Sequence, residues 1–367
     1  MARRKKNKYL FIAFLVSIVI VGAFVIRTAS LFPFFFQLFF NRDIQLKQVD
    51  SSLNILLLGI GGGAHDGPNL TDTIIFASLN SKTNKITLVS VPRDLWVPDL
   101  KGKINTAYSY GESKKKGGGL ILSKAAVSKV VGKPIDYVVR IDFDGFIKAI
   151  NLIGGLDVNV DRTLDDYEYP VEGKENDLCG HKEEELEELA TASSQLEAFP
   201  CRYKHLHFDK GSQRMDGKSA LEFVRSRHAK GEEGSDFARS KRQTKVITAF
   251  KDKIFSVDTL FNPGKIISLY DVLQTSIDTN IKQDEFDDFI RLAEKMKKGK
   301  IESAVLDTGD TLKKREGLLI APESKIDYDL QWVVIPRAGN GDFSEIQKYV
   351  DCEINAGNCT VSKAADN

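Results

Sequence analysis

Short apolar runs separated by turn sequences fill the first part of the folded region. Residues 53–60, LNILLLGI, are almost continuously apolar, which is typical of a strand buried on both faces. Residues 73–79 and 85–91 predict two further strands, and the sequence NSKTN between them predicts that they form a hairpin. The Gly-rich sequence after the first strand can bring the backbone close to a ligand.

Helical and strand-like patterns alternate further along the chain, apart from residues 92–108, which look irregular. Strands that alternate with helices predict an α/β domain with a central mixed β-sheet flanked by helices. The expected helices are 118–131, 143–153, one long helix opening near Ser235, and 284–298; the expected strands are 137–141, 157–160, 301–306 and 330–335.

The N-terminus carries a basic segment and then an apolar one. Residues 1–8, MARRKKNK, precede residues 9–26, which are apolar and uncharged throughout. A helix over 9–26 would be roughly 27 Å long, close to the thickness of the bilayer hydrocarbon. We therefore predict a cytoplasmic tail, one transmembrane helix and an extracellular remainder, since basic residues favour the cytoplasmic side. A cleaved signal peptide is the alternative, but the apolar run is longer than such peptides carry.

Residues 27–52 are expected to form an interfacial segment and stalk. The stretch 31–40 is aromatic, broken by Pro33 and too short to span, so it suits the outer membrane interface. A folded extracellular domain is expected at 53–350 and a C-terminal tail at 351–367. The protein is thus predicted to be a single-pass protein of the cell membrane.

The overall charge excludes one class of partner. The 52 Lys and Arg residues balance 51 Asp and Glu residues, which leaves a net charge of +1. No overall field would attract nucleic acid, and we expect no nucleic-acid partner. Any specificity for an anion must be local.

Residues 162–211 interrupt the α/β pattern and predict an acidic surface insertion. The run HKEEELEE at 181–188 lacks the loop of a calcium site, so a solvated face is expected. Four cysteines on the predicted outer side indicate two disulfides. Pairing Cys179 with Cys201 and Cys352 with Cys359 closes the shortest loops, while the other two pairings remain open. A zinc site is the competing interpretation, disfavoured because no CxxC spacing occurs.

The sequence between residues 225 and 243 concentrates arginines. Two of them precede a Gly- and Glu-rich loop, and a helix opening near Ser235 would carry the others along one face. Planar guanidinium groups bind phosphate oxygens through paired hydrogen bonds, so four converging arginines indicate a diphosphate site. A solvated basic helix face is the alternative. The residues are Arg225 and Arg227 before the loop, and Asp236, Arg239, Arg242 and Gln243 on the helix.

Five separated motifs occur in one order along the chain. They are LNILLLGIG, LTDT, SVPRDLWV, KINTAYSYG, and VRSRH followed by SDFARSKRQ. Together they resemble the LytR-CpsA-Psr family from about residue 53 to about residue 250. The resemblance implies a membrane-anchored phosphotransferase that moves a glycopolymer from an undecaprenyl-type polyprenyl pyrophosphate carrier to peptidoglycan. It also implies Mg²⁺ bridging the pyrophosphate.

The resemblance suggests roles for the residues in these motifs. The arginines, including Arg93, would stabilise charge on the phosphates, and Gln243 would hold an oxygen. Asp72 is the expected metal ligand, because Mg²⁺ prefers a carboxylate with phosphate oxygens and water. Asp94 and Asp236 would orient arginines, or one of them would take the proton of the attacking hydroxyl.

Each of these motifs also has a purely structural interpretation. Arg93 and Asp94 alone fit a turn with a local ion pair, and Asp72 alone fits a turn cap. Lys103, Asn105 and Tyr108 are the expected substrate contacts, although Asn105 and Tyr108 are equally compatible with packing.

Two positions depart from the family pattern. Gly61 stands where many members have Asp, and Leu70 stands where many have Arg. His65 and Asp66 are the nearest candidates to replace the missing groups, and we expect Asp66 to take a metal-side role.

Two other functions compete with a transferase. One is a pyrophosphatase that hydrolyses the carrier, and the other is a non-catalytic extracellular module that binds the lipid pyrophosphate. The substitutions at Gly61 and Leu70 favour the binding module. An arm of eight residues is too short for a DNA-binding domain, which disfavours transcriptional regulation.

Overall fold

The computed structural model describes residues 44–46, 52–63, 67–189, 191–254, 268, 272, 276–310, 315–357 and 359–361. The predicted basic tail, the predicted span at 9–26, most of the stalk, and His65 and Asp66 lie outside these residues. Among the helices that the structure describes, none combines the length and apolar character needed to cross a membrane.

The chain divides into two compact units. Within the described residues, the smaller unit comprises 44–46 and 282–295, where η5 (Gln283–Glu285) leads into α11 (Phe286–Lys295). This helix confirms the one predicted at 284–298, with a shorter extent. The larger unit holds all the other elements described below.

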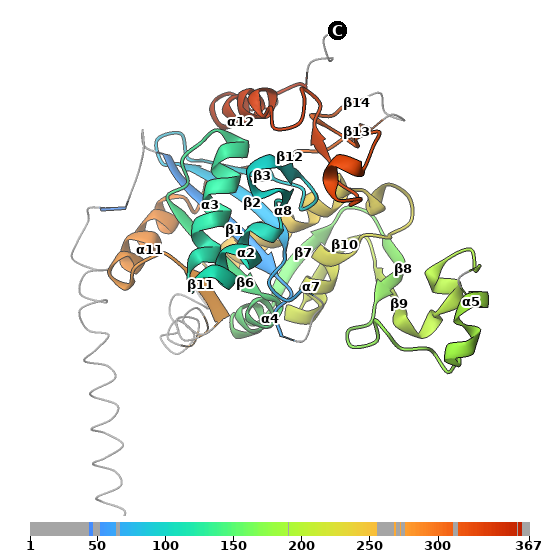
Figure 1. The fold of residues 1–367 in the computed structure, drawn as a ribbon. Helices are drawn as coiled ribbons and strands as arrows, with labels where there is room; N and C mark the ends of the chain where they lie inside the picture. Colours follow the sequence, from blue (N-terminus) through green and yellow to red (C-terminus); the bar gives the residue numbers. More distant parts are fainter. Residues whose placement is uncertain are drawn as a thin grey trace, which may run out of the picture. The chain divides into compact units, whose positions relative to one another are not determined.

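A six-stranded sheet in the order β11-β6-β1-β2-β3-β12 forms the centre of the larger unit (Figure 1). The strand β1 runs parallel to β6 and antiparallel to β2, and β3 runs antiparallel to β2 but parallel to β12. The sheet is therefore mixed, as predicted. Its strands are β1 (Ser52–Ile60), β2 (Thr71–Asn80), β3 (Lys85–Ser90), β6 (Tyr137–Asp142), β11 (Ile277–Thr279) and β12 (Lys300–Val305).

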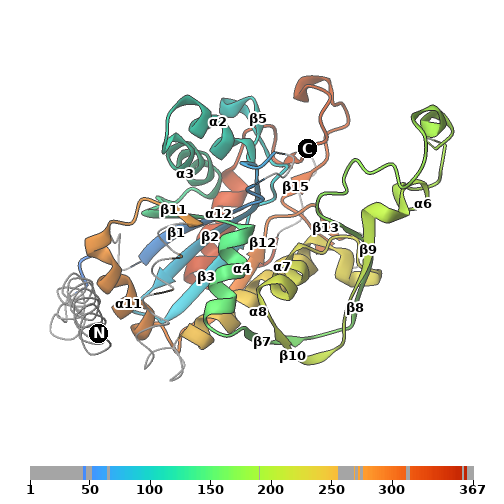
Figure 2. The ribbon, with the colours of Figure 1, turned by 90° about the horizontal axis from the view of Figure 1, so that it is seen from below.

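Helices cover both faces of this sheet (Figure 2). On one face, α2 (Thr106–Lys114), α3 (Gly118–Val131) and α12 (Ser344–Asn355) bury Leu56, Phe76 and Val89 in the main core. The helix α8 (Asp236–Ile254) lies on the opposite face. It shares a second core with α4 (Phe143–Leu152) and α7 (Gly217–Arg225). The prediction of a sheet flanked by helices is confirmed.

Two pairs of antiparallel strands extend from the helices of the second core. The strands β7 (Leu156–Val160) and β10 (Gly211–Met215) pair antiparallel, as do β8 (Leu164–Pro170) and β9 (Tyr203–Phe208). The predicted acidic insertion corresponds to β8, β9 and the segment between them. That segment contains η2 (Glu183–Glu185), α5 (Leu186–Leu189), α6 (Gln195–Ala198) and η3 (Pro200–Arg202). Disulfides join Cys179 to Cys201 and Cys352 to Cys359, which confirms the shortest-loop pairings.

Two expectations about local structure are wrong. Residues 92–108 were expected to be irregular, but they contain β4 (Trp96–Val97), η1 (Pro98–Leu100), β5 (Gly102–Lys103) and the start of α2, which begins at Thr106.

Gly111 in α2 directly faces Gly118 in α3, and the missing side chains let the two helices approach closely.

Of the strand expected at 330–335, only Ile335 belongs to a named strand, β16 (Ile335–Pro336), which pairs with β15 (Leu319–Ile320). The other short elements of this part of the chain are β13 (Gly309–Asp310), β14 (Arg315–Glu316) and η6 (Ile326–Tyr328). The helix α12 also crosses residue 351, where the C-terminal tail was expected to begin.

Candidate active site

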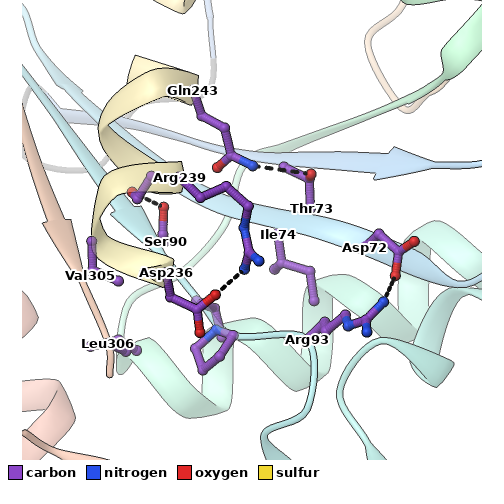
Figure 3. A pocket seen from close by; sticks show the side chains of 13 residues that line it. Asp72, Thr73, Ile74, Ser90, Arg93, Asp236, Arg239, Gln243, Val305 and Leu306 are labelled. Carbon is purple, nitrogen blue, oxygen red and sulfur yellow. Dashed lines mark hydrogen bonds and ion pairs between the residues drawn. The ribbon is translucent and has the colours of Figure 1, made fainter. Parts of the chain in front are cut away.

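A cleft lies where β2 and β3 meet the first turns of α8 (Figure 3). Two polar contacts tie the helix to the sheet there. The hydroxyls of Ser90 and Ser240 lie 2.7 Å apart, and Gln243 Nε2 donates to Thr73 Oγ1 at 3.5 Å. The residues that line the cleft are Asp72, Thr73, Ile74, Ser90, Val91, Pro92, Arg93, Asp236, Arg239, Ser240, Gln243, Val305 and Leu306.

Two arginine–aspartate pairs face each other across this cleft. Arg93 Nη1 donates to Asp72 Oδ1 at 2.6 Å, and Arg239 Nη2 lies 2.8 Å from Asp236 Oδ1. Figure 3 shows the two pairs on opposite sides of the Ile74 side chain. All four charged residues were predicted from the sequence, and the structure brings them together from β2, the β3–β4 connection and α8.

A chain of ion pairs orients Arg93. Its Nε lies 3.4 Å from Asp94 Oδ2, and Lys103 Nζ donates to Asp94 Oδ1 at 2.8 Å. Burial alone would lower the pKa of Arg93, but the hydrogen bond and charge of Asp72, together with Asp94, raise it above its ordinary value. Asp94 and Lys103 thus lie behind Arg93, and neither lines the cleft among the described residues.

Arg227 adds a third positive charge near the same place. Burial, followed by the charges of Arg239 and Arg93, lowers the pKa of Arg227 to about 10, while Asp72 and Asp236 act in the opposite direction. Among the described residues, the Arg227 guanidinium makes no hydrogen bond or ion pair. A half-buried cation held beside two other cations is a strong attractor for an anion.

A buried carboxylate fixes the backbone that carries Arg227. Asp166 is fully buried, and its Oδ2 accepts hydrogen bonds from Ser226 Oγ at 2.7 Å and from the backbone N–H groups of Arg227 and His228 at 3.2 Å. Asp166 was not predicted from the sequence. It lies in the insertion, remote in sequence from every motif, and no local pattern indicated its contact with Ser226, Arg227 and His228.

Two of the predicted arginines point elsewhere. Arg242 is buried, and its guanidinium donates to the carbonyl oxygens of Phe223, Ser226 and Glu233 and to the Glu233 carboxylate. The expectation that Arg242 shares the cleft face of α8 is therefore wrong.

Arg225 is likewise absent from the residues that line the cleft. Its guanidinium carbon lies 4.1 Å from the ring centroid of Phe143 and 5.9 Å from that of Tyr169. Two aromatic faces therefore hold Arg225, as is common for arginine. Four arginines do not converge on this cleft as expected; Arg93 and Arg239 line it, and Arg227 lies close enough to be influenced by both.

The two remaining predicted contacts lie behind the site. The carbonyl oxygen of Asn105 accepts from Thr71 N at 3.1 Å, and its N–H donates to Arg93 O at 3.2 Å, so Asn105 braces the backbone beside Asp72 and Arg93. Tyr108 is buried and donates to Asp278 Oδ2 at 2.7 Å. Burial and this hydrogen bond raise the pKa of Tyr108 to about 12. Neither side chain lines the cleft, which favours packing roles for both.

The donor set of the cleft fits Mg²⁺. Asp72 and Asp236 offer carboxylate oxygens, and Mg²⁺ in phosphoryl-transfer sites takes one or two carboxylates and completes its shell with phosphate oxygens and water. Asp72 is only partly covered, with a side chain 39% exposed, so it is accessible to an ion. The expected role of Asp66 stays a prediction.

Three smaller polar side chains in the cleft were missed by the sequence analysis. Thr73 and Ser90 belong to motifs whose charged members alone were considered, and Ser240 follows Asp236 by four positions on α8. The helical spacing of Asp236, Ser240 and Gln243 was the available signal, because residues 3 and 4 apart share a face.

The fold and the site define an α/β protein with a cleft whose arginines can bind a phosphorylated ligand. The sequence profile of the LytR_cpsA_psr family matches residues 39–327, and the chain belongs to this family.

Curated relatives carry names from cell-wall chemistry. The chain is 28% identical over 254 residues to the polyisoprenyl-teichoic acid--peptidoglycan teichoic acid transferase TagU of Bacillus mycoides, covering 68% of this chain and 67% of the relative. It is 29% identical over 240 residues to the Bacillus cereus protein of the same name, covering 64% of this chain and 62% of that one. The chain thus spans about two thirds of these relatives.

Solved structures share the fold of this chain. The crystal structure of B. subtilis TagV superposes with a TM-score of 0.52 at 23% identity, covering 83% of this chain and 97% of that chain. A structure of TagT bound to LIIa-WTA gives a TM-score of 0.51 at 22% identity, covering 84% and 93%. At these identities the likeness concerns the fold.

Proposed function

We propose that this protein is a membrane-anchored phosphotransferase. It moves a glycopolymer from a polyprenyl pyrophosphate carrier to peptidoglycan or another cell-wall acceptor. The observation that carries this proposal is the proximity of Arg93, Arg227 and Arg239 at a cleft that also offers Asp72. The names of the relatives, which are teichoic acid transferases, support the same chemistry.

The cleft suits a diphosphate because its two arginines can exchange an aspartate oxygen for a phosphate oxygen. Arg93 and Arg239 each hold one aspartate at the cleft, and each guanidinium has further N–H groups for phosphate oxygens. Burial, followed by the charges of Arg239 and Arg93, lowers the pKa of Arg227, and a diphosphate in the cleft would offset the repulsion among these three cations. Ligand charge and site charge are therefore complementary.

The reaction needs one bond to form and one to break. The acceptor hydroxyl attacks the phosphorus atom next to the glycan, a new P–O bond forms, and the P–O–P bond breaks so that polyprenyl phosphate leaves. The product is a phosphodiester between the glycan and the acceptor. Negative charge grows on the leaving phosphate, and Arg93, Arg227 and Arg239 stabilise that charge.

The two remaining aspartates of the motifs have different surroundings. Asp94 is held between Arg93 and Lys103, which suits a group that orients Arg93. Asp236 has a side chain 62% exposed and pairs with Arg239, so it is the better candidate to accept the proton of the acceptor hydroxyl. Mg²⁺, held by Asp72 and phosphate oxygens, would supply further charge neutralisation at the diphosphate.

The proposed location follows from the lipid carrier. A polyprenyl chain keeps the substrate in the membrane, so the cleft must lie close to the bilayer. The predicted span at 9–26, with the basic residues before it in the cytoplasm, would hold the enzyme domain at the outer surface.

The test follows both products by mass spectrometry. The full-length chain in detergent is given a polyprenyl-pyrophosphate glycan, a peptidoglycan oligomer and Mg²⁺. We expect a glycan–phosphodiester adduct on the acceptor, which is lost in Arg93→Ala. Arg214→Ala is the matched control, because Arg214 also pairs with an aspartate, Asp157, but lies on β10 outside the cleft.

Other outcomes would replace the proposal. Free glycan phosphate without an adduct would assign a pyrophosphatase. Saturable binding of the lipid with no turnover would assign a binding module, as the substitutions at Gly61 and Leu70 allow.

A further inference from the structure

A cluster of histidines lies on the exposed face of the β8–β9 hairpin, away from the cleft. Leu206 and Phe208 of β9 point into the second core, so the alternate residues His205 and His207 share the outer face. Asp165 of β8 stands directly opposite His207 in the antiparallel register. Three potential metal ligands therefore project from one face of two paired strands.

The three side chains already converge on one point. His205 Nε2 and His207 Nδ1 each lie 2.8 Å from Asp165 Oδ1. One ligand atom from each residue lies within 4.8 Å of the other two. A carboxylate oxygen only accepts hydrogen bonds, so in this arrangement each facing nitrogen carries a proton. A metal ion would replace these two protons and bind the same three groups.

Neighbouring side chains hold the imidazoles in place. His207 Nε2 lies 3.2 Å from Asp209 Oδ1, and the Tyr167 ring stacks on His205 with centroids 4.0 Å apart and planes 4° apart. Metal-binding histidines commonly donate their second ring nitrogen to a carboxylate, which fixes the tautomer. Asp209 is placed to do this once His207 Nδ1 holds a metal.

We propose that Asp165, His205 and His207 form a binding site for a transition-metal ion of the zinc type. Two imidazole nitrogens and one carboxylate oxygen are ligands that Zn²⁺ accepts in a tetrahedral shell, which water completes. Mg²⁺ prefers oxygen ligands, so this site is chemically different from the proposed site at Asp72. The proposal does not depend on the proposed transferase activity.

The position of the site indicates a structural role for the ion. It would cross-link β8 to β9 at Asp165, whose carbonyl oxygen accepts from Lys230 N at 2.8 Å. The next residue, Asp166, anchors the backbone of Arg227. A bound ion would therefore stabilise the part of the hairpin that supports the backbone of Arg227.

A second group with metal-ligand spacing carries no such inference. Asp177, Cys179 and Cys201 also lie close together, but both cysteines belong to one disulfide. Their sulfur atoms are not available as thiolate ligands.

The test measures metal binding by the full-length protein, purified in detergent without a polyhistidine tag and stripped of metal. Calorimetry with Zn²⁺ is expected to give one saturable site that excess Mg²⁺ does not block. Co²⁺ as a spectroscopic probe is expected to give the intense visible bands of a tetrahedral site with nitrogen ligands. His207→Ala and His205→Ala should abolish both signals, and Asp209→Asn should weaken Zn²⁺ affinity about tenfold to a hundredfold.

His181→Ala is the matched control, because His181 is partly exposed, pairs with Glu185 and lies in the same insertion. It should bind Zn²⁺ as the unaltered protein does. Unchanged Zn²⁺ binding in His205→Ala and His207→Ala would overturn the proposal. The absence of tetrahedral Co²⁺ bands in the unaltered protein would also overturn it, and that measurement requires no variant to fold. The three groups would then be a hydrogen-bonded cluster only.

Discussion

Two arginines three residues apart on α8 have opposite surroundings. Arg239 faces the cleft and pairs with one exposed aspartate. Arg242 faces the interior, where three backbone carbonyls and the Glu233 carboxylate accept from its guanidinium. The first can exchange its partner for a phosphate, whereas the second is buried and already makes four hydrogen bonds inside the protein.

This comparison separates stability from ligand binding. A guanidinium whose hydrogen bonds are all made inside the protein holds α7, η4 (Gly231–Gly234) and α8 together. A guanidinium that keeps free N–H groups at a cleft contributes little to folding but can stabilise charge in a reaction. The residue type is the same in both cases, and only the partners decide its role.

The largest expected effect is on stability, from Arg242→Ala. Removing this side chain leaves the Glu233 carboxylate and three carbonyls without their donor. We expect the free energy of unfolding to fall by about 3–5 kcal/mol, the usual cost of breaking a buried charged pair. Denaturant titration of the full-length chain in detergent measures it.

The matched control for Arg242→Ala is Arg214→Ala, which removes an exposed pair and should change stability by less than about 1 kcal/mol. Equal losses in the two variants would show that the contacts of Arg242 do not stabilise the fold.

The next effect concerns activity, from Arg239→Ala. We expect the rate of glycan transfer to fall about a hundredfold to a thousandfold, the range found when one preorganised donor to a developing charge is removed. Stability should change by less than about 1 kcal/mol, because Asp236, the partner left behind, is exposed to solvent. Transfer rates and unfolding curves from the same preparation check both statements. If Arg239→Ala were strongly destabilised but transferred glycan at the normal rate, the roles assigned to Arg239 and Arg242 would be reversed.

Sequence analysis predicted most of the fold because the central strands and helices carry strong periodic patterns. The run at 53–60 and the helix at 118–131 are found where expected, since their apolar spacing leaves one way to bury them. Short elements such as β4 and β15 escaped, because two-residue strands depend on tertiary partners rather than on local pattern.

The site was predicted in part from the sequence motifs. Arg93, Asp72, Asp236 and Arg239 belong to motifs, and the motifs do converge. Arg242 does not share the face of Asp236, because residues on one face of a helix are three or four positions apart and these two are six apart on α8. Asp166 could not be found, because its contact with Ser226 joins residues 60 positions apart.

A smaller effect is expected from Asp166→Asn, which tests whether the buried anchor positions Arg227. Both carboxylate oxygens of Asp166 accept hydrogen bonds, Oδ2 from Ser226 Oγ and two backbone N–H groups and Oδ1 from Glu168 N, whereas an amide has only one acceptor oxygen and cannot serve both positions. We expect stability to fall by about 1–3 kcal/mol. Affinity for inorganic pyrophosphate should fall as well, as Arg227 loses its position.

The control for Asp166→Asn is Asp161→Asn, which removes an exposed partner of Lys245 and should change stability by no more than about 0.5 kcal/mol. Calorimetry with pyrophosphate distinguishes the two possible roles of Asp166. Unchanged affinity in a destabilised Asp166→Asn would mean that Asp166 supports the fold but does not position Arg227.

The smallest expected effect is a pH dependence of anion binding caused by Arg227. Its pKa is lowered to about 10 in the folded protein, so it loses its proton in a range where ordinary arginines stay charged. A bound anion favours the charged form, so affinity for pyrophosphate should fall as pH rises through 10, by up to about tenfold per pH unit. Arg227→Gln lacks this titration and should bind more weakly at pH 8 but show a flatter decline above pH 10. Calorimetry of both proteins across this range cancels the ionisation of the probe itself. Parallel declines would mean that Arg227 does not contact the anion, and the cleft would then rely on Arg93 and Arg239.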